Sequence, residues 1–119
     1  MSTVLGKWGE EISASYLRKK RYEIIGANFH TRFGEIDLIA TKKKTLAFVE
    51  VKLRKNDLYG EAGEFVTFAK QRKLITSAEI WLQNNPTNLQ PRFDVIEIYA
   101  PNGIGGKYSL KHIKNAFHR

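Results

Sequence analysis

The chain has 119 residues, enough for one domain with a modest hydrophobic core, and we expect residues 1–119 to form a single domain. Twenty Lys and Arg against twelve Asp and Glu give a formal net charge of +8 and a pI of about 9.8, which favours nucleic acid as a partner. The absence of cysteine excludes disulfides and thiolate chemistry, and the lack of a long apolar run argues against a membrane span, so we expect a cytoplasmic protein.

The first predicted element is a helix over residues 4–20. Its apolar positions follow helical spacing, at Leu5, Trp8, Ile12 and Tyr16. On a helical projection, Glu10 falls at the edge of this apolar arc, so its carboxylate can face inward. The alternative is that Glu10 only complements the helix dipole in an early turn.

Three β-strands are predicted next, over residues 22–29, 35–40 and 46–52, and short polar turns join them into an antiparallel meander. If Lys43 and Lys44 form a two-residue hairpin loop, Asp37 lies directly opposite Glu50, with Cβ atoms roughly 4.5–5.5 Å apart. Because side chains alternate along a strand, Lys52 shares the face of Glu50. A loop one residue longer, without a bulge, would turn Asp37 to the opposite face.

Two carboxylates and a lysine on one face of a hairpin predict a metal site. Like charges at this distance repel strongly in an apolar sheet, and a hard divalent cation, Mg²⁺ or Mn²⁺, would remove the repulsion. Lys52 could then orient or activate a water molecule. The alternative for Asp37, Glu50 and Lys52 is a surface ion pair, but the apolar neighbours Val49 and Val51 favour buried charges.

Residues 53–63 hold two glycines and several charges, and this pattern predicts a mobile loop beside the site, with Arg54 on the site face. A second helix is predicted over residues 67–84, with Thr67 as its cap. Gln71 lies on the apolar stripe of this helix, and Lys70 lies in the same turn. Both could donate to a phosphate, although Gln71 could instead be satisfied by the backbone.

The last predicted elements are a strand over residues 92–99 and a strand followed by a short helix over residues 108–117. Because a helix connects them, the strands at 46–52 and 92–99 should be parallel, which predicts an α/β fold with a mixed sheet flanked by helices. Asp94 is expected to be a structural partner for an arginine or a backbone group. The three histidines show no spacing for a zinc site.

Two strings carry a resemblance to a known family: GEIDLIA at residues 34–40 and FVEVK at residues 48–52. Together with further matches along nearly the whole chain, they resemble the YraN family of small bacterial proteins. The further matches lie at residues 9–10, 28, 54, 60, 70, 78, 81–82 and 92–95.

The YraN family is similar to the Holliday junction resolvases and the wider PD-(D/E)XK nuclease superfamily, which implies a restriction-endonuclease-like α/β core. The resemblance implies metal-binding acids at Asp37 and Glu50, a catalytic lysine at Lys52 and a helical glutamate at Glu10. It also implies a homodimer, because a junction presents two related strands.

The sequence therefore predicts a Mg²⁺- or Mn²⁺-dependent nuclease that hydrolyses DNA, including branched or single-stranded DNA. The metal would be held by Glu10, Asp37 and Glu50, and the phosphate by Arg54, Lys70 and Gln71.

Two alternatives remain open. One is a non-catalytic nucleic-acid-binding module, or a partner in DNA processing, that retains the nuclease scaffold. The other is an enzyme or ribosome-associated factor that acts on RNA, which we weigh below DNA. Tyr59, Phe65 and Phe68 could stack on unpaired bases, or could simply pack in the core or loop.

Overall fold

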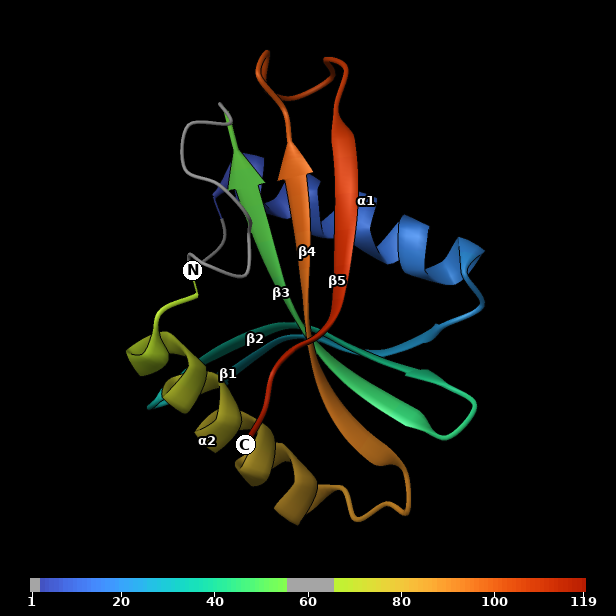
Figure 1. Ribbon diagram of the computed structural model, residues 1–119, viewed down its shortest axis with the longest axis vertical. Coiled ribbons are helices and arrows are strands. Elements are labelled where there is room, and N and C mark those ends of the chain that lie inside the picture. The colour runs from blue at the N-terminus through green and yellow to red at the C-terminus, as the bar shows by residue number, and fades with distance from the viewer. Residues whose placement is uncertain (1–2, 56–65) are drawn as a thin grey trace.

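The computed structural model describes residues 3–55 and 66–119, and these form two helices and five strands (Figure 1). Most of the predicted loop at 53–63 falls outside the described residues, as do Tyr59 and Phe65. The elements, in chain order, are α1 (Val4–Lys19), β1 (Glu23–Thr31), β2 (Gly34–Lys42), β3 (Thr45–Arg54), α2 (Phe68–Asn84), β4 (Gln90–Tyr99) and β5 (Ser109–Phe117).

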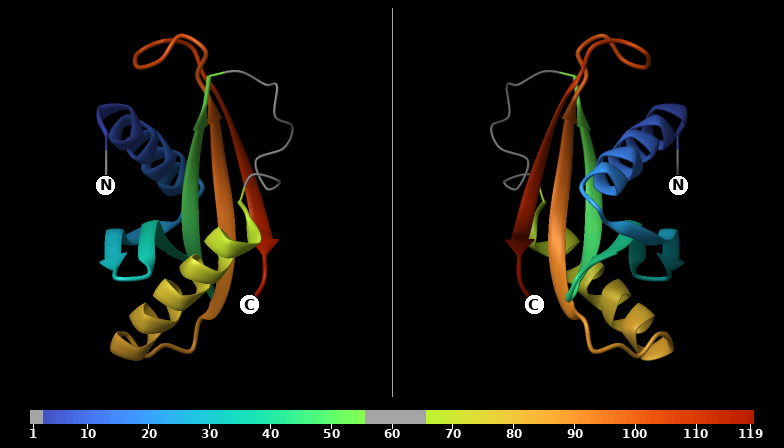
Figure 2. Two further views of the ribbon diagram at one scale, coloured as in Figure 1. Left: turned by 90° about the vertical axis from the view of Figure 1, so that its left-hand side faces the viewer. Right: turned by 90° about the vertical axis from the view of Figure 1, so that its right-hand side faces the viewer.

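The strands form one sheet in the order β1-β2-β3-β4-β5, and the helices lie on opposite faces of it. Figure 2 shows the sheet edge-on, with α1 on one side and the N-terminal half of α2 on the other. Leu17 of α1 is buried in one hydrophobic cluster, and Leu74 and Ile75 of α2 belong to a second cluster on the other face. The predicted α/β class with a mixed sheet is confirmed.

Both predicted helices are present, and each begins at a threonine cap. Thr3 Oγ1 accepts a hydrogen bond of 2.9 Å from the backbone amide of Gly6, and Thr67 Oγ1 accepts one of 3.1 Å from Lys70. The predicted cap at Thr67 is therefore confirmed. Neither helix in the described part of the chain has both the length and the hydrophobicity needed to cross a membrane.

The β2–β3 hairpin has the predicted register. Lys42 pairs with Thr45 and Leu38 pairs with Val49, so Lys43 and Lys44 form the loop. The paired stretch ends at Leu38, and Figure 1 shows the beginning of β2 swinging away from the end of β3. The two strands therefore part next to Asp37 and Glu50, which leaves room between them for a cavity.

β3 and β4 pair in parallel along their whole length, from Thr45–Gln90 to Arg54–Tyr99, as the connecting helix predicted. The expectation of a short helix near the C-terminus is wrong. Residues 109–117 form the edge strand β5, antiparallel to β4, with an irregularity opposite Phe93–Val95. Asn115, with φ of 56°, lies in this irregular part, and the break in alternation that it causes suggested the helix.

Asp94 is a structural residue, as predicted. Its carboxylate accepts two 2.8 Å hydrogen bonds from Arg92 and one of 3.0 Å from the backbone amide of Asn115, and lies 2.8 Å from His112 Nε2. Although burial alone would raise the pKa of Asp94, the hydrogen bonds from His112, Arg92 and Asn115 outweigh it and lower the pKa. This network ties β5 to β4.

Candidate functional site

A cavity of about 190 Å³ opens where α1, β2, β3 and α2 meet. It is predominantly polar, and four carboxylates, from three different elements, line it together with one lysine. The residues around it are Thr3, Gly6, Glu10, Glu35, Asp37, Glu50, Val51, Leu53 and Lys70. The parting of β2 from β3 gives this cavity its floor.

The central feature of the cavity is the carboxylate pair of Asp37 and Glu50. Asp37 Oδ2 accepts a 2.8 Å hydrogen bond from the backbone amide of Val51, and Glu50 is buried, with 6% of its surface exposed. Burial, followed by the charge of Glu50, raises the pKa of Asp37 to about 8, and a hydrogen bond to Glu50 and the charge of Glu10 add to the rise. The pair therefore retains a proton near neutral pH.

Glu10 reaches the cavity from α1 because the preceding residue has no side chain. A Cβ atom at Gly9 would lie 2.9 Å from Leu53 Cδ1, so glycine allows α1 to approach β3 closely. Glu10 lines the cavity, and its negative charge contributes to the raised pKa of Asp37. Its predicted inward orientation is the one that the structure shows.

Lys70 supplies the positive charge that the structure sets against the acid pair. Its Nζ lies 3.4 Å from Glu50 Oε2, and its side chain is 45% exposed while that of Glu50 is 7% exposed. Since α2 begins at Phe68, Lys70 lies in the first turn of the helix and extends over the mouth of the cavity. The ammonium is thus able to move between Glu50 and solvent.

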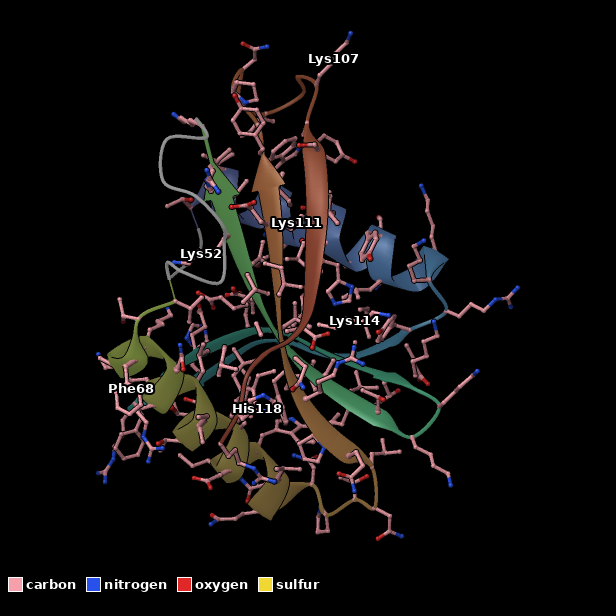
Figure 3. All side chains as sticks on the ribbon, in the orientation of Figure 1. Lys52, Phe68, Lys107, Lys111, Lys114 and His118 are labelled. Carbon is pink, nitrogen blue, oxygen red and sulfur yellow. The ribbon has the colours of Figure 1, made fainter. Side chains whose placement is uncertain are left out.

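Three of the residues selected from the sequence do not line the cavity. Lys52 follows Glu50 on the same face of β3 and is half-buried, and Figure 3 shows it beside the end of that strand. Arg54 forms an ion pair with Glu97 of β4. Gln71 donates a 2.8 Å hydrogen bond to the backbone carbonyl of Val66, which is the backbone alternative considered for it.

Two contributions to the cavity were missed. Glu35 lines it and lies 3.1 Å from His30 through Oε2 and Nε2, and strand alternation, which puts Glu35 on the same face as Asp37, could have pointed to it. Lys70 contacts Glu50 directly, whereas its expected partner was a phosphate. Two further features of the sequence could have pointed to these residues. Glu35 follows Gly34 at the start of β2, and Lys70 lies three residues after the helix cap Thr67.

Carboxylate oxygens around a small polar cavity suit a hard divalent cation, which takes one or two protein carboxylates and keeps several waters. The raised pKa of Asp37 is what an acid pair shows when no such cation compensates it. Within residues 3–55 and 66–119, no three acidic or histidine side chains are close enough to enclose a metal by themselves. The donor set therefore fits a cation held on one side by protein and open to solvent on the other.

Comparison with known proteins identifies relatives along nearly the whole chain. Residues 9–98 match the profile of "Uncharacterised protein family UPF0102". A UPF0102 protein of Syntrophomonas wolfei is 43% identical over 118 residues, covering 98% of this chain and 100% of the relative. One from Caldanaerobacter subterraneus is 43% identical over 114 residues (95% and 93%), and one from Vibrio parahaemolyticus is 45% identical over 97 residues (80% of each). The resemblance to the YraN family is confirmed.

Proposed function

We propose that this chain, which belongs to the uncharacterised protein family UPF0102, is a metal-dependent nuclease that hydrolyses phosphodiester bonds in DNA. The observation that carries the proposal is the convergence of Glu10, Asp37 and Glu50 on one cavity, with Lys70 at its mouth. Separate elements contribute these charges, and three carboxylates brought to one cavity with a single lysine require a reason. Binding and activating a phosphodiester provides one.

Mg²⁺ or Mn²⁺ would be held by Asp37 and Glu50, with Glu10 binding it through a coordinated water. When bound, such an ion supplies a water of lowered pKa and offsets the negative charge that develops on the phosphate. Asp37 would lose its retained proton on binding the ion. The backbone amide of Val51 holds the Asp37 carboxylate in position throughout.

Two lysines are assigned roles in this chemistry: Lys70, which lines the cavity, and Lys52, which follows Glu50 by two residues on β3. The Lys70 ammonium can leave Glu50 and bind a phosphate oxygen instead, because the lysine side chain is nearly half exposed. Lys52 lies two residues beyond Glu50 on the same face of β3, and we assign it the role of orienting the attacking water by donating a hydrogen bond to it. Arg54 and Gln71 would contribute to phosphate binding only after leaving Glu97 and Val66.

The charge of the whole chain supports a nucleic acid as substrate. With a formal net charge of +8, association with a polyanion should be fast and strongly dependent on salt. A cytoplasmic location and a homodimer, in which two sites would act on related strands, complete the proposal.

The test is a cleavage panel with purified protein on single-stranded, duplex, flapped and four-way-junction DNA, in the presence of Mg²⁺ or Mn²⁺ and in chelator. We expect cleavage of at least one substrate, and a loss of at least about 100-fold with Asp37→Asn or Glu50→Gln. Glu79→Gln, a change at an exposed acid of α2, is the matched control and should retain full activity. Equal cleavage by Asp37→Asn and wild type would overturn the assignment.

A different outcome would favour the non-catalytic alternative. If the wild type binds DNA with a steep salt dependence, without need of a metal, and yields no product on any substrate, then the scaffold serves for binding alone.

A further inference from the structure

The strand β5 (Ser109–Phe117) forms one edge of the sheet. Among the strands that the structure describes, it pairs only with β4, and it is the last in the sheet order. Figure 1 shows β5 along the margin of the sheet, with α1 crossing behind it and extending past it. The outer backbone amides and carbonyls of such a strand can pair with a strand of another molecule, so β5 offers an edge to which a peptide can be added.

The face of β5 that packs on α1 is rich in aromatic side chains. The Tyr108 ring, just before β5, lies 5.7 Å from the Trp8 ring, and His112 Nδ1 lies 3.0 Å from Tyr16 Oη. Trp8, Ile12 and Tyr16 recur at intervals of four residues, so they form one stripe of α1, and all three are only half-buried. A strand added outside β5 would lie against this stripe and beside Tyr108, which is 48% exposed. Apolar side chains are therefore favoured on that face of the added strand.

The opposite face of β5 is basic. Alternation points Lys111 away from α1, and its side chain is exposed. Glu97 of β4, which is opposite Lys111 in the register, is already ion-paired with Arg54. Residues 100–119 include one arginine and three lysines but no aspartate or glutamate. Figure 3 labels these lysines, which are Lys107, Lys111 and Lys114. Acidic side chains are therefore favoured on this face of an added strand.

The acids of α1 lie away from this edge. Glu10 lines the acid cavity, and Glu10 and Glu11 both line a second groove, of about 370 Å³, between α1 and β1. By contrast, Lys20 Nζ lies 6.0 Å from the centre of the Tyr16 ring, so α1 adds a cation beside β5. Both elements that form the edge thus carry positive charge next to aromatic side chains.

We propose that β5, together with the stripe of α1 at Trp8, Ile12 and Tyr16, binds an extended acidic segment of a partner protein, which adds to the sheet as a further strand. The backbone of this segment would pair with the outer side of β5. Its apolar side chains, at every second position, would contact the stripe, and the acidic side chains between them would face Lys111. We call β5 and this stripe the peptide edge.

The charges of the peptide edge disfavour a second copy of this chain as the occupant. Pairing of β5 with β5 would bring together two strands that carry lysines and no acids, and like charges across a strand pair are destabilising. DNA would satisfy the lysines, but a sugar–phosphate backbone has no hydrogen-bond donors for the outer carbonyls of β5. An acidic peptide uses the backbone, the stripe and the cations at once.

The peptide edge goes beyond the proposed nuclease. Its stripe residues, Tyr108 and Lys111 do not line the acid cavity, so binding of the peptide needs neither metal nor cleavage. A failure of the cleavage panel would leave the peptide edge untouched, and a failure to bind peptide would leave the nuclease untouched.

The probe is a fluorescein-labelled nine-residue peptide of alternating glutamate and valine, with both ends blocked, and fluorescence anisotropy measures its binding to the whole protein in chelator. We expect binding that saturates below about 1 mM peptide. The same peptide with its internal amides N-methylated keeps every side chain but cannot pair with a strand, and it should bind at least about tenfold more weakly. Equal binding of the two peptides, or no binding of the first, would overturn the inference.

Substitutions in the protein test the two faces of the peptide edge. Lys111→Glu should weaken binding at least about tenfold, because it replaces an attraction by a repulsion. Lys44→Glu makes the same change of charge at an exposed lysine of the β2–β3 loop, and it should change the affinity less than twofold. Tyr108→Ala, which removes a half-exposed ring, should weaken binding about threefold. Circular dichroism checks that each variant folds. Equal affinities of Lys111→Glu and Lys44→Glu would contradict the proposed orientation.

Hydrogen exchange locates the bound peptide. Saturating peptide should slow exchange of the amides of residues 109–113 that point away from β4, and protection confined to other elements would overturn the inference. If Lys111→Glu weakens binding of a 20-base-pair DNA duplex while no peptide binds, the lysines serve DNA instead. If the wild type sediments as a dimer whose hydrogen-exchange protection lies on residues 109–113, the edge belongs to a second copy.

Discussion

Two aspartates of the same sheet, Asp94 and Asp37, lie in opposite electrostatic environments. Asp94 is fully buried on β4, and a guanidinium, an imidazole and a backbone amide surround its carboxylate, so its pKa is lowered. Asp37 on β2 has a single backbone amide as donor and faces the carboxylate of Glu50, and burial and that neighbour raise its pKa to about 8. One carboxylate has all its partners within the fold, and the other lacks them.

This difference separates a structural acid from a candidate functional one. A buried charge that the chain itself neutralises contributes to stability, while one left without compensation reduces stability unless a ligand neutralises it. The comparison thus locates the site without reference to any relative. Each prediction below tests whether the two acids differ in this way.

The largest effect is expected from Asp94→Ala. The substitution leaves the half-buried Arg92 and the buried side chain of His112 without their carboxylate partner, so the free energy of unfolding should fall by about 3–5 kcal/mol. Urea denaturation measures this loss directly. A decrease below about 1 kcal/mol would show that Asp94 is not the structural acid of the pair.

Asp37→Asn should instead increase the free energy of unfolding, and the size of this increase should depend on pH. Because the pKa of Asp37 is raised from 3.8 to about 8 on folding, the unfolded chain binds fewer protons between these values, and wild-type stability falls as pH rises through this window. Asparagine does not titrate, so the variant should be more stable by about 2 kcal/mol at pH 8, and by much less near pH 4.

Urea denaturation of wild type and Asp37→Asn between pH 4 and pH 9, without divalent cations, provides the measurement. A stability difference that stays constant with pH would mean that Asp37 is ionised normally in the folded protein. A control at Glu79→Gln should show no such trend, since that side chain is exposed.

The structure also shows how far the sequence predicts such a site. The hairpin register followed from the short polar loop at Lys43 and Lys44 and from alternation on both sides, and Leu38 pairs with Val49 as expected. That register was sufficient to bring Asp37 and Glu50 together. Local pattern determines this part of the fold because the two strands are adjacent in the chain.

Contacts between distant elements were harder to predict. Lys52 was chosen over Lys70 as the lysine of the acid pair because alternation along a strand can be predicted from the sequence. The position of the start of α2 relative to β3 depends instead on how the whole helix packs. The bond from Gln71 to the carbonyl of Val66, by contrast, is local, and it is the backbone alternative that the sequence left open. The C-terminal strand was read partly as a helix because the irregularity around Asn115 interrupts its alternation.

A smaller effect is expected from Lys70→Met. The ion pair with Glu50 is nearly half exposed on the lysine side, so its loss should change the free energy of unfolding by less than about 1 kcal/mol. Removal of a positive charge that competes for Glu50 should tighten binding of Mn²⁺ by about threefold. Lys73→Met, which removes an exposed lysine of the same helix outside the cavity, should leave Mn²⁺ affinity unchanged. Weaker Mn²⁺ binding by Lys70→Met would contradict this role.

The most direct test of the account is a calorimetric titration of Mn²⁺ into the wild type, Asp37→Asn, Glu50→Gln and the control Glu79→Gln at pH 7. The account predicts a bound ion in the wild type and the control, and at least about a tenfold loss of affinity in each of the other two variants, because each has lost a carboxylate ligand. Equal affinity in all four proteins would show that the paired acids hold no cation and would contradict the central claim.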